Sequence, residues 1–170
     1  MAEKKQNEGR TSGLPFPIEC NFTLRRIVER GDRPLIGNAR AAYEIARATI
    51  EDAAQEAFMA FFLDVKNRLI KAKIMHVGTV DSSAVYPREV IREALTCDAS
   101  AMVFSHNHPS GDPDPSLCDR AITRELVFAS KVMGLKVLDH IVIGDNAYFS
   151  FADHGLIGDY DLQALSLQSR

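Results

Sequence analysis

The stretch AMVFSHNHPSGDPDPSLCD, residues 101–119, decides the fold, because its pattern changes from that of a strand to that of a loop and then to that of a helix. Its first residues, Ala101–Phe104, form a short apolar run that predicts a buried strand. His106 and His108 follow at the end of this strand, and because strand side chains alternate with a period of two, both imidazoles should point to the same side. Three prolines and a glycine then stop the strand and are expected to bring the start of a long amphipathic helix, residues 116–133, back over the strand end.

Asp119 lies one turn inside this predicted helix, where its carboxylate can approach the two imidazoles. Two histidines and a carboxylate without a fourth protein ligand are typical of a catalytic zinc site, which keeps a position open for water and lowers the pKa of that water to about 7. We therefore predict that His106, His108 and Asp119 bind one Zn²⁺ per chain and support metal-assisted hydrolysis. Such hydrolysis also needs a general base, and a carboxylate outside the ligand set is suited to that role.

Some of these residues have simpler explanations. Ser116 and Asp119 stand at the spacing of a capping box, so a helix start alone accounts for both. The His-x-His pair directly upstream has no comparable packing explanation, and it favours the metal site. Cys118 is adjacent to Asp119 but one position round the helix, so its thiol is expected to point elsewhere. Three further histidines stand alone in or beside strand patterns and are expected to be structural residues, not ligands: His76, His140 and His154.

The rest of the chain predicts a single α/β domain with flanking regions. The elements expected from apolar periodicity and turn residues are a helix over 38–53, a β-hairpin with strands over 57–63 and 69–77, a helix that opens at Pro87, and a second hairpin over 137–143 and 147–151. The regions expected are a disordered N-terminal arm over 1–17, an N-terminal helical region over 18–54, the domain itself over 55–158 and a C-terminal tail over 159–170.

Composition narrows the class of protein. A chain of 170 residues that is 46% hydrophobic can close one core of its own. A formal net charge of -3 gives no general attraction for nucleic acid, so charge does not support DNA as a partner. The three cysteines, an odd number at unrelated spacings, indicate free thiols in a reducing compartment. Because the sequence has no apolar run typical of a signal peptide or a membrane span, we expect a soluble, cytoplasmic protein with no membrane partner.

The pattern H-x-H-x7-S-x2-D is complete here, from His106 through Ser116 to Asp119. It resembles the motif of the JAMM metalloproteases, the JAB/MPN domains, and the flanking segments GTVDSSAVYPREV, SHNHPSGDPDPS and VLDHIVIGDNAYFSFADHGLI resemble the RadC family of these domains. The resemblance covers about residues 50–157 and implies a three-layer JAB/MPN fold, similar to cytidine deaminases, with a mixed, curved β-sheet flanked by helices. The deaminase signature, H-x-E with P-C-x-x-C, is absent from the sequence, which argues against deamination.

The resemblance also implies roles for individual residues. In the wider family a glutamate at the start of the strand before the first hairpin turn acts as general base, which makes Glu56 the candidate here. Ser116 corresponds to the family serine that helps to stabilise the oxyanion. RadC relatives often carry a glutamate where this chain has Lys73, a difference that would impair this protein if that glutamate is catalytic. Glu89 is a further acid near the site in sequence, although the helix dipole alone also favours a glutamate in a first turn.

Three functions are compatible with this sequence. The first is a zinc-dependent metalloprotease or isopeptidase acting on a peptide or protein substrate, with Glu56 and Ser116 as catalytic residues. The second is a non-catalytic, metal-containing module in DNA repair or mobile-element biology, which Lys73 favours. The third is a structural zinc domain, which three protein ligands fit poorly because they leave one position open. A homodimer is also compatible with the sequence, because exposed Phe and Val residues on short edge strands could pair two copies of the chain.

Overall fold

The computed structural model describes residues 33–51, 53–78 and 85–168. Within them a five-stranded sheet has the order β2-β1-β3-β4-β5. Neighbouring strands are antiparallel except for β3 and β4, which are parallel, so the sheet is mixed. The strands are β1 (Ala57–Leu63), β2 (Leu69–Val77), β3 (Ala101–Asn107), β4 (Lys136–Ile143) and β5 (Tyr148–Ser150). The expected disordered arm over 1–17 lies outside the described residues.

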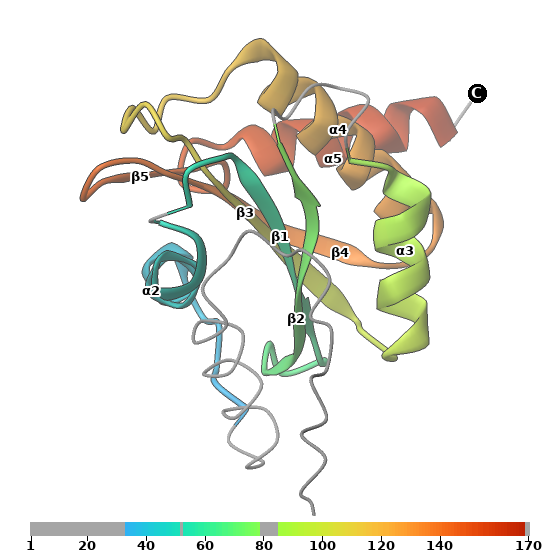
Figure 1. The fold of residues 1–170 in the computed structure, drawn as a ribbon. Coiled ribbons are helices and arrows are strands. Elements are labelled where there is room, and N and C mark those ends of the chain that lie inside the picture. The colour runs from blue at the N-terminus through green and yellow to red at the C-terminus, as the bar shows by residue number, and fades with distance from the viewer. Residues whose placement is uncertain (1–32, 52, 79–84, 169–170) are drawn as a thin grey trace, which may run out of the picture.

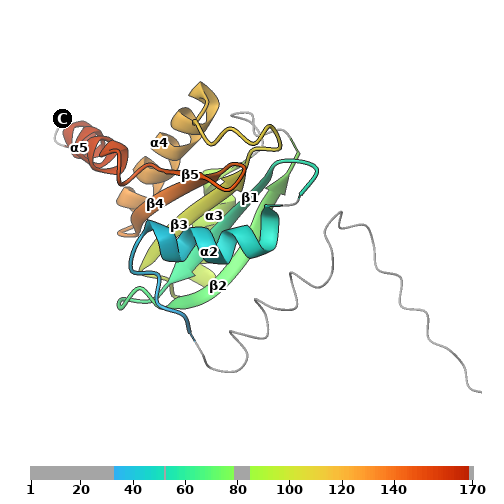
Figure 2. The same ribbon diagram turned by 90° about the vertical axis from the view of Figure 1, so that its left-hand side faces the viewer.

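Helices cover both faces of this sheet (Figures 1 and 2). One face packs against α2 (Ala39–Ile50). The other face packs against α3 (Pro87–Thr96), α4 (Leu117–Val132) and α5 (Leu156–Gln168). Within the described ranges, no helix is long and apolar enough to cross a lipid bilayer. The three layers and the mixed sheet confirm the α/β architecture that the resemblance implied.

The interior strand β1 explains the longest apolar run of the sequence. All seven of its residues are buried, because the strand lies between two layers of helices. Its side chains alternate between these layers: Ala57, Met59, Phe61 and Leu63 pack in the core with α2, and Phe58, Ala60 and Phe62 pack in the core with α3 and α4. The predicted strands over 57–63 and 69–77 coincide with β1 and β2.

Local sequence sets where the helices begin and end. The Asn38 side chain caps α2 by accepting a hydrogen bond from the Ala41 N–H at 2.9 Å. Pro87 opens α3, where its missing N–H would have had no partner within the helix. Gly134 follows the end of α4 with φ at 71°, a conformation that glycine adopts without strain.

The C-terminal region differs from the prediction. Residues 159–168, expected as a tail, belong to α5, which packs against α4. Ile157, Tyr160 and Ala164 on this helix are buried, and the first two are part of the core beneath α3 and α4. The prediction of a tail was therefore wrong for these residues, because α5 completes one helical layer of the domain.

Candidate metal centre

His106 lies on β3, the strand between β1 and β4, and its side chain is fully buried. It stands opposite Phe58 on β1 and Val142 on β4, so neighbouring strands fix its backbone from both sides. The next residue, Asn107, ties the strand end to the start of β1, because its carboxamide oxygen accepts a hydrogen bond from the Ala57 N–H at 2.8 Å. The polar end of β3 thus remains ordered, and the strand extends beyond its predicted end.

His108 follows directly after β3, and its backbone N–H donates to the Ile143 carbonyl at 2.8 Å. Its imidazole Nδ1 lies 2.7 Å from the carbonyl oxygen of Asp112. Because a carbonyl can only accept a hydrogen bond, this contact assigns a proton to Nδ1. In the neutral ring the lone pair is then on Nε2, the atom that faces the site.

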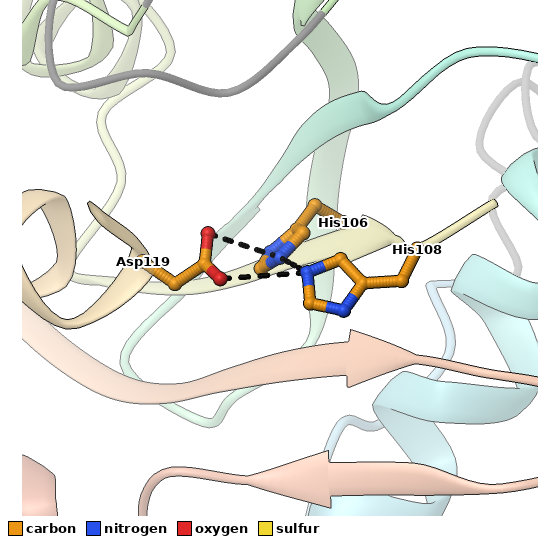
Figure 3. A group of neighbouring side chains, drawn as sticks. All are labelled: His106, His108 and Asp119. Carbon is orange, nitrogen blue, oxygen red and sulfur yellow. Dashed lines mark hydrogen bonds and ion pairs between the residues drawn. The ribbon is translucent and has the colours of Figure 1, made fainter. Parts of the chain in front are cut away.

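The three predicted ligands converge at the start of α4 (Figure 3). The Nε2 atoms of His106 and His108 are 3.0 Å apart. Asp119 places Oδ1 at 3.2 Å from the first of these atoms and Oδ2 at 3.4 Å from the second. Two ligand atoms about 2.0–2.1 Å from a tetrahedral ion lie about 3.3–3.4 Å from each other. The spacing of these donor atoms therefore fits one small metal ion, which the three residues could hold.

Asp119 also closes the N-terminus of α4. Ser116 is the N-cap, and its Oγ accepts from the Asp119 N–H at 3.1 Å, while Asp119 Oδ2 accepts from the Ser116 N–H at 2.7 Å. The Ser116 hydroxyl donates to the same Oδ2 at 2.7 Å. The capping box and the ligand cluster were alternatives in the sequence, but both are present and they share one carboxylate.

The Asp119 carboxylate places a negative charge in a buried position, where its side chain is 2% exposed. Such a charge is costly without a positive partner. Burial by itself raises the pKa of Asp119, but hydrogen bonds from His106 and His108 outweigh it and hold that pKa well below its usual range. The hydrogen bond to Asp119 raises the pKa of His108 in turn. The cluster therefore favours a positive charge, which a bound metal ion supplies as well as a protonated imidazole does.

Metal uptake should accordingly release protons, because the ion and a proton compete for Nε2 of His108. The pKa of His108 is raised above its ordinary value of 6.5, so zinc affinity should fall as the pH drops through that raised pKa, by up to about tenfold per pH unit. In the metal-free protein the sign is opposite: the charged pair stabilises the fold while His108 is protonated, and this contribution is lost as the pH rises through the raised pKa.

Calorimetric titration of the metal-free protein with zinc, in two buffers of different ionisation enthalpy, measures the released protons directly. The two buffers should give different heats at neutral pH. The difference should shrink at a pH well above the raised pKa of His108, where no proton remains on Nε2. Identical heats in both buffers at neutral pH would contradict the assignment of His108 as a ligand.

His140 lies closer to the cluster than the sequence indicated. Its Nε2 is 2.8 Å from Nδ1 of His106, and burial lowers the pKa of the enclosed His140 ring well below its usual value. The contact joins residues 34 positions apart, on neighbouring parallel strands, so no local pattern could have revealed it. His140 is not in the ligand group of the described residues, as predicted, but its contact with His106 was not expected. By contrast, His154 stacks on Phe149 with ring centroids 3.9 Å apart, and neither it nor His76 joins the ligand group found in the described residues.

Glu56, the predicted general base, immediately precedes β1, two residues before the Phe58 that stands opposite His106. Its carbonyl accepts a hydrogen bond from the Gly78 N–H at 2.9 Å. Its negative charge contributes to the raised pKa of His108, so its carboxylate acts on the cluster electrostatically. Glu89, the other candidate acid, forms ion pairs with two arginines close to it in sequence, Arg88 and Arg92.

Lys73 contacts a helix and is not part of the ligand group. Its Nζ lies 2.9 Å from a carboxylate oxygen of Glu93 on α3, and the Nζ of Lys71 lies 2.7 Å from the other oxygen. These contacts with Lys71 and Lys73 lower the pKa of Glu93. Lys73 therefore joins the edge strand β2 to α3, in a half-exposed ion pair of the kind that adds at most about 1 kcal/mol to stability.

A cleft of about 510 Å³ opens beside His108, between the end of α2 and the turn from β4 to β5. Arg47 joins these two elements, because its guanidinium donates to Glu51 at 2.6 Å and to the Asn146 side chain at 2.9 Å. Asp145 on the same turn lines the cleft as well. The space next to the cluster is thus bounded by charged and amide groups.

The loop after His108 packs tightly on this turn. A Cβ atom at Gly144 would lie 2.3 Å from the Gly111 carbonyl oxygen and 2.8 Å from Pro113, so the loop would have to move. We expect Gly144→Ala to lower the free energy of unfolding by about 1–3 kcal/mol. It should also weaken zinc binding, since the same loop carries the Asp112 carbonyl that orients His108.

Chemical denaturation and zinc titration measure these two effects. Gly158→Ala on α5 is the matched control, because a Cβ there meets nothing within 4 Å. This control should leave zinc binding unchanged and should be neutral or slightly stabilising, since alanine favours helix over glycine. Equal behaviour of the two variants would show that the loop tolerates displacement.

Comparison with known proteins places this geometry in a family. A family model described as the RadC-like JAB domain matches residues 36–156. A UPF0758 protein from Actinobacillus pleuropneumoniae serotype 5b is 49% identical over 146 residues, which cover 85% of this chain and 66% of that relative. UPF0758 proteins from Pseudoalteromonas translucida and Pasteurella multocida are 44% and 42% identical, over 80% and 65% of this chain and 61% and 50% of their own lengths. The chain thus spans one half to two thirds of these relatives, and it belongs to the RadC family, whose JAB domain it contains.

Proposed function

We propose that this protein is a zinc-dependent metallohydrolase of the JAMM type, a metallopeptidase or isopeptidase that cleaves an amide bond in a peptide or protein. The observation that carries the proposal is the convergence of two imidazole nitrogens and a buried carboxylate at 3.0 to 3.4 Å. Three protein ligands with a position left open are typical of catalytic zinc, whereas structural zinc has four. The Glu56 carboxylate, which acts on His108, supplies the general base that hydrolysis needs outside the ligand set.

In this proposal His106, His108 and Asp119 hold the ion. Zinc, when bound, acts as a Lewis acid and lowers the pKa of a coordinated water toward about 7. Glu56 accepts a proton from the attacking water and passes it to the departing amine, so that a C–O bond forms as the amide C–N bond breaks. The Ser116 hydroxyl now donates to Asp119, and it would turn this proton toward the substrate carbonyl oxygen to stabilise the oxyanion.

The cleft beside His108 is the proposed place for the substrate. Its walls carry the Arg47 guanidinium, the Asn146 amide and the Asp145 carboxylate, groups that can pair with the backbone and polar side chains of an extended peptide. We further propose that the protein acts in the cytoplasm. The free thiols of Cys97 and Cys118 suit a reducing compartment.

Turnover of peptides by the zinc-loaded protein tests this function. A mixture of peptides of diverse sequence, together with an isopeptide-linked pair, is incubated with the protein, and new amine termini are identified by mass spectrometry. Cleavage should vanish on chelation and return when zinc is restored. Zinc-loaded protein that cleaves nothing in these mixtures, but binds DNA in a steeply salt-dependent way, would favour the non-catalytic module instead.

A further inference from the structure

A column of hydrogen bonds runs from the candidate metal centre into the core. His106 Nδ1 lies 2.8 Å from His140 Nε2, and His140 Nδ1 lies 2.6 Å from Thr123 Oγ1. The Thr123 hydroxyl donates to the backbone carbonyl of Asp119 at 2.5 Å. These side chains come from β3, β4 and α4, and all three are fully buried. The column therefore begins at one predicted ligand and ends on the backbone of another.

The chemistry of the last acceptor fixes the direction of every bond in this column. Since the Asp119 carbonyl can only accept, the single proton of the Thr123 hydroxyl is used there, and Thr123 must accept from His140 Nδ1. A neutral His140 with its proton on Nδ1 can only accept at Nε2. His106 must then donate from Nδ1, so that in the neutral, metal-bound ring the lone pair of His106 lies on Nε2, the atom that faces His108 and Asp119.

The opposite direction is incompatible with metal binding. If Thr123 donated to His140 Nδ1, the His140 proton would move to Nε2 and be donated to His106. The neutral His106 ring would then carry its own proton on Nε2, where a ligand needs a lone pair. The Thr123 hydroxyl would also lose its hydrogen bond to the Asp119 carbonyl.

We propose that Thr123 and His140 are positioning residues that hold His106 in the tautomer able to bind a metal ion through Nε2. This inference rests on the proposed function, because it assumes that the cluster binds an ion. It also gives the site a distinct electrostatic character. A metal-binding histidine often donates its other N–H to a carboxylate, which makes the ligand more basic. Here the acceptor is a neutral imidazole, so His106 would be a less basic ligand than a histidine that donates to a carboxylate.

Substitution of Thr123 tests the column with little change of shape. Thr123→Val removes the hydroxyl, and we expect it to weaken zinc binding about 10- to 100-fold, the effect usual for the loss of a partner behind a ligand. Thr123→Ser restores the hydroxyl and should bind zinc within about threefold of the wild type. Thr49→Val is the matched control, because Thr49 is a buried helical threonine whose hydroxyl bonds a carbonyl at 3.1 Å and no histidine. It should leave zinc affinity unchanged.

A second measurement is direct and needs no variant. In zinc-loaded wild-type protein with ¹⁵N-labelled histidine, NMR should show the protons of His106 and His140 on Nδ1 in both rings. A proton on Nε2 of His140, or a Thr123→Val variant that binds zinc as tightly as the wild type, would overturn the inference. Wild-type protein that takes up no zinc would instead overturn the proposed function, so the two failures are distinguishable.

Discussion

Purified wild-type protein should contain about one zinc ion per chain, and His108→Ala should contain none. The substitution removes one of three donors from a cluster whose members lie 3.0 to 3.4 Å apart. If the roughly 10–16 kcal/mol of binding to a four-ligand zinc site is shared equally, one ligand contributes about 2.5–4 kcal/mol, or about two to three powers of ten in affinity. Elemental analysis of protein purified without chelators measures the metal content.

His154→Ala is the control for this experiment, because His154 stacks on Phe149 outside the cluster. This variant should keep the full zinc content, and the His108 variant should remain folded by circular dichroism. Wild-type protein that contains no metal and cannot be reloaded with zinc would contradict the hydrolase proposal and favour a non-catalytic binding module.

The second large effect is expected from Glu56→Gln. Glutamine keeps the size of the side chain but cannot take up a proton, so turnover should fall about 10²–10⁴-fold while zinc content stays at the wild-type level. Peptide cleavage rates and elemental analysis on the same preparation separate the two quantities. A loss of zinc together with turnover would mean that Glu56 supports the cluster and does not act as the base.

Glu89→Gln provides the comparison, since Glu89 was the other candidate acid and pairs with Arg88 and Arg92. It should retain most of the turnover. If the Glu56 variant kept its activity and the Glu89 variant lost it, the general base would be Glu89.

The fold was largely predictable because its central elements carry unambiguous local patterns. A run of seven apolar residues from Ala57 to Leu63 can be buried only between two layers, and the positions of β1 and β2 followed from it. The start of α4 followed from the spacing of Ser116 and Asp119, which predicts a capping box in any context. The convergence of His106 and His108 followed from the period of a strand.

Other features depend on tertiary contacts that local patterns do not reveal. His140 contacts His106 because β4 lies beside β3 and parallel to it. The register between two strands that a long helix connects cannot be predicted from the sequence of either strand alone. The sequence pattern did not predict α5, because apolar residues lie on both its buried and its exposed sides. Tyr160 is buried while Leu162 and Leu165 are exposed, so the helical period that should mark an amphipathic helix is blurred.

The Asp119 carboxylate is both part of the cap of α4 and a predicted metal ligand. The start of α4 is therefore held in place whether or not an ion is bound. Ser116 holds Asp119 with hydrogen bonds that need no metal, so an incoming ion finds its anionic ligand already in place. Little conformational entropy is then lost on binding. When the ion leaves, the N-terminus of α4 stays capped and does not fray. The domain is therefore expected to keep its fold when no ion is bound.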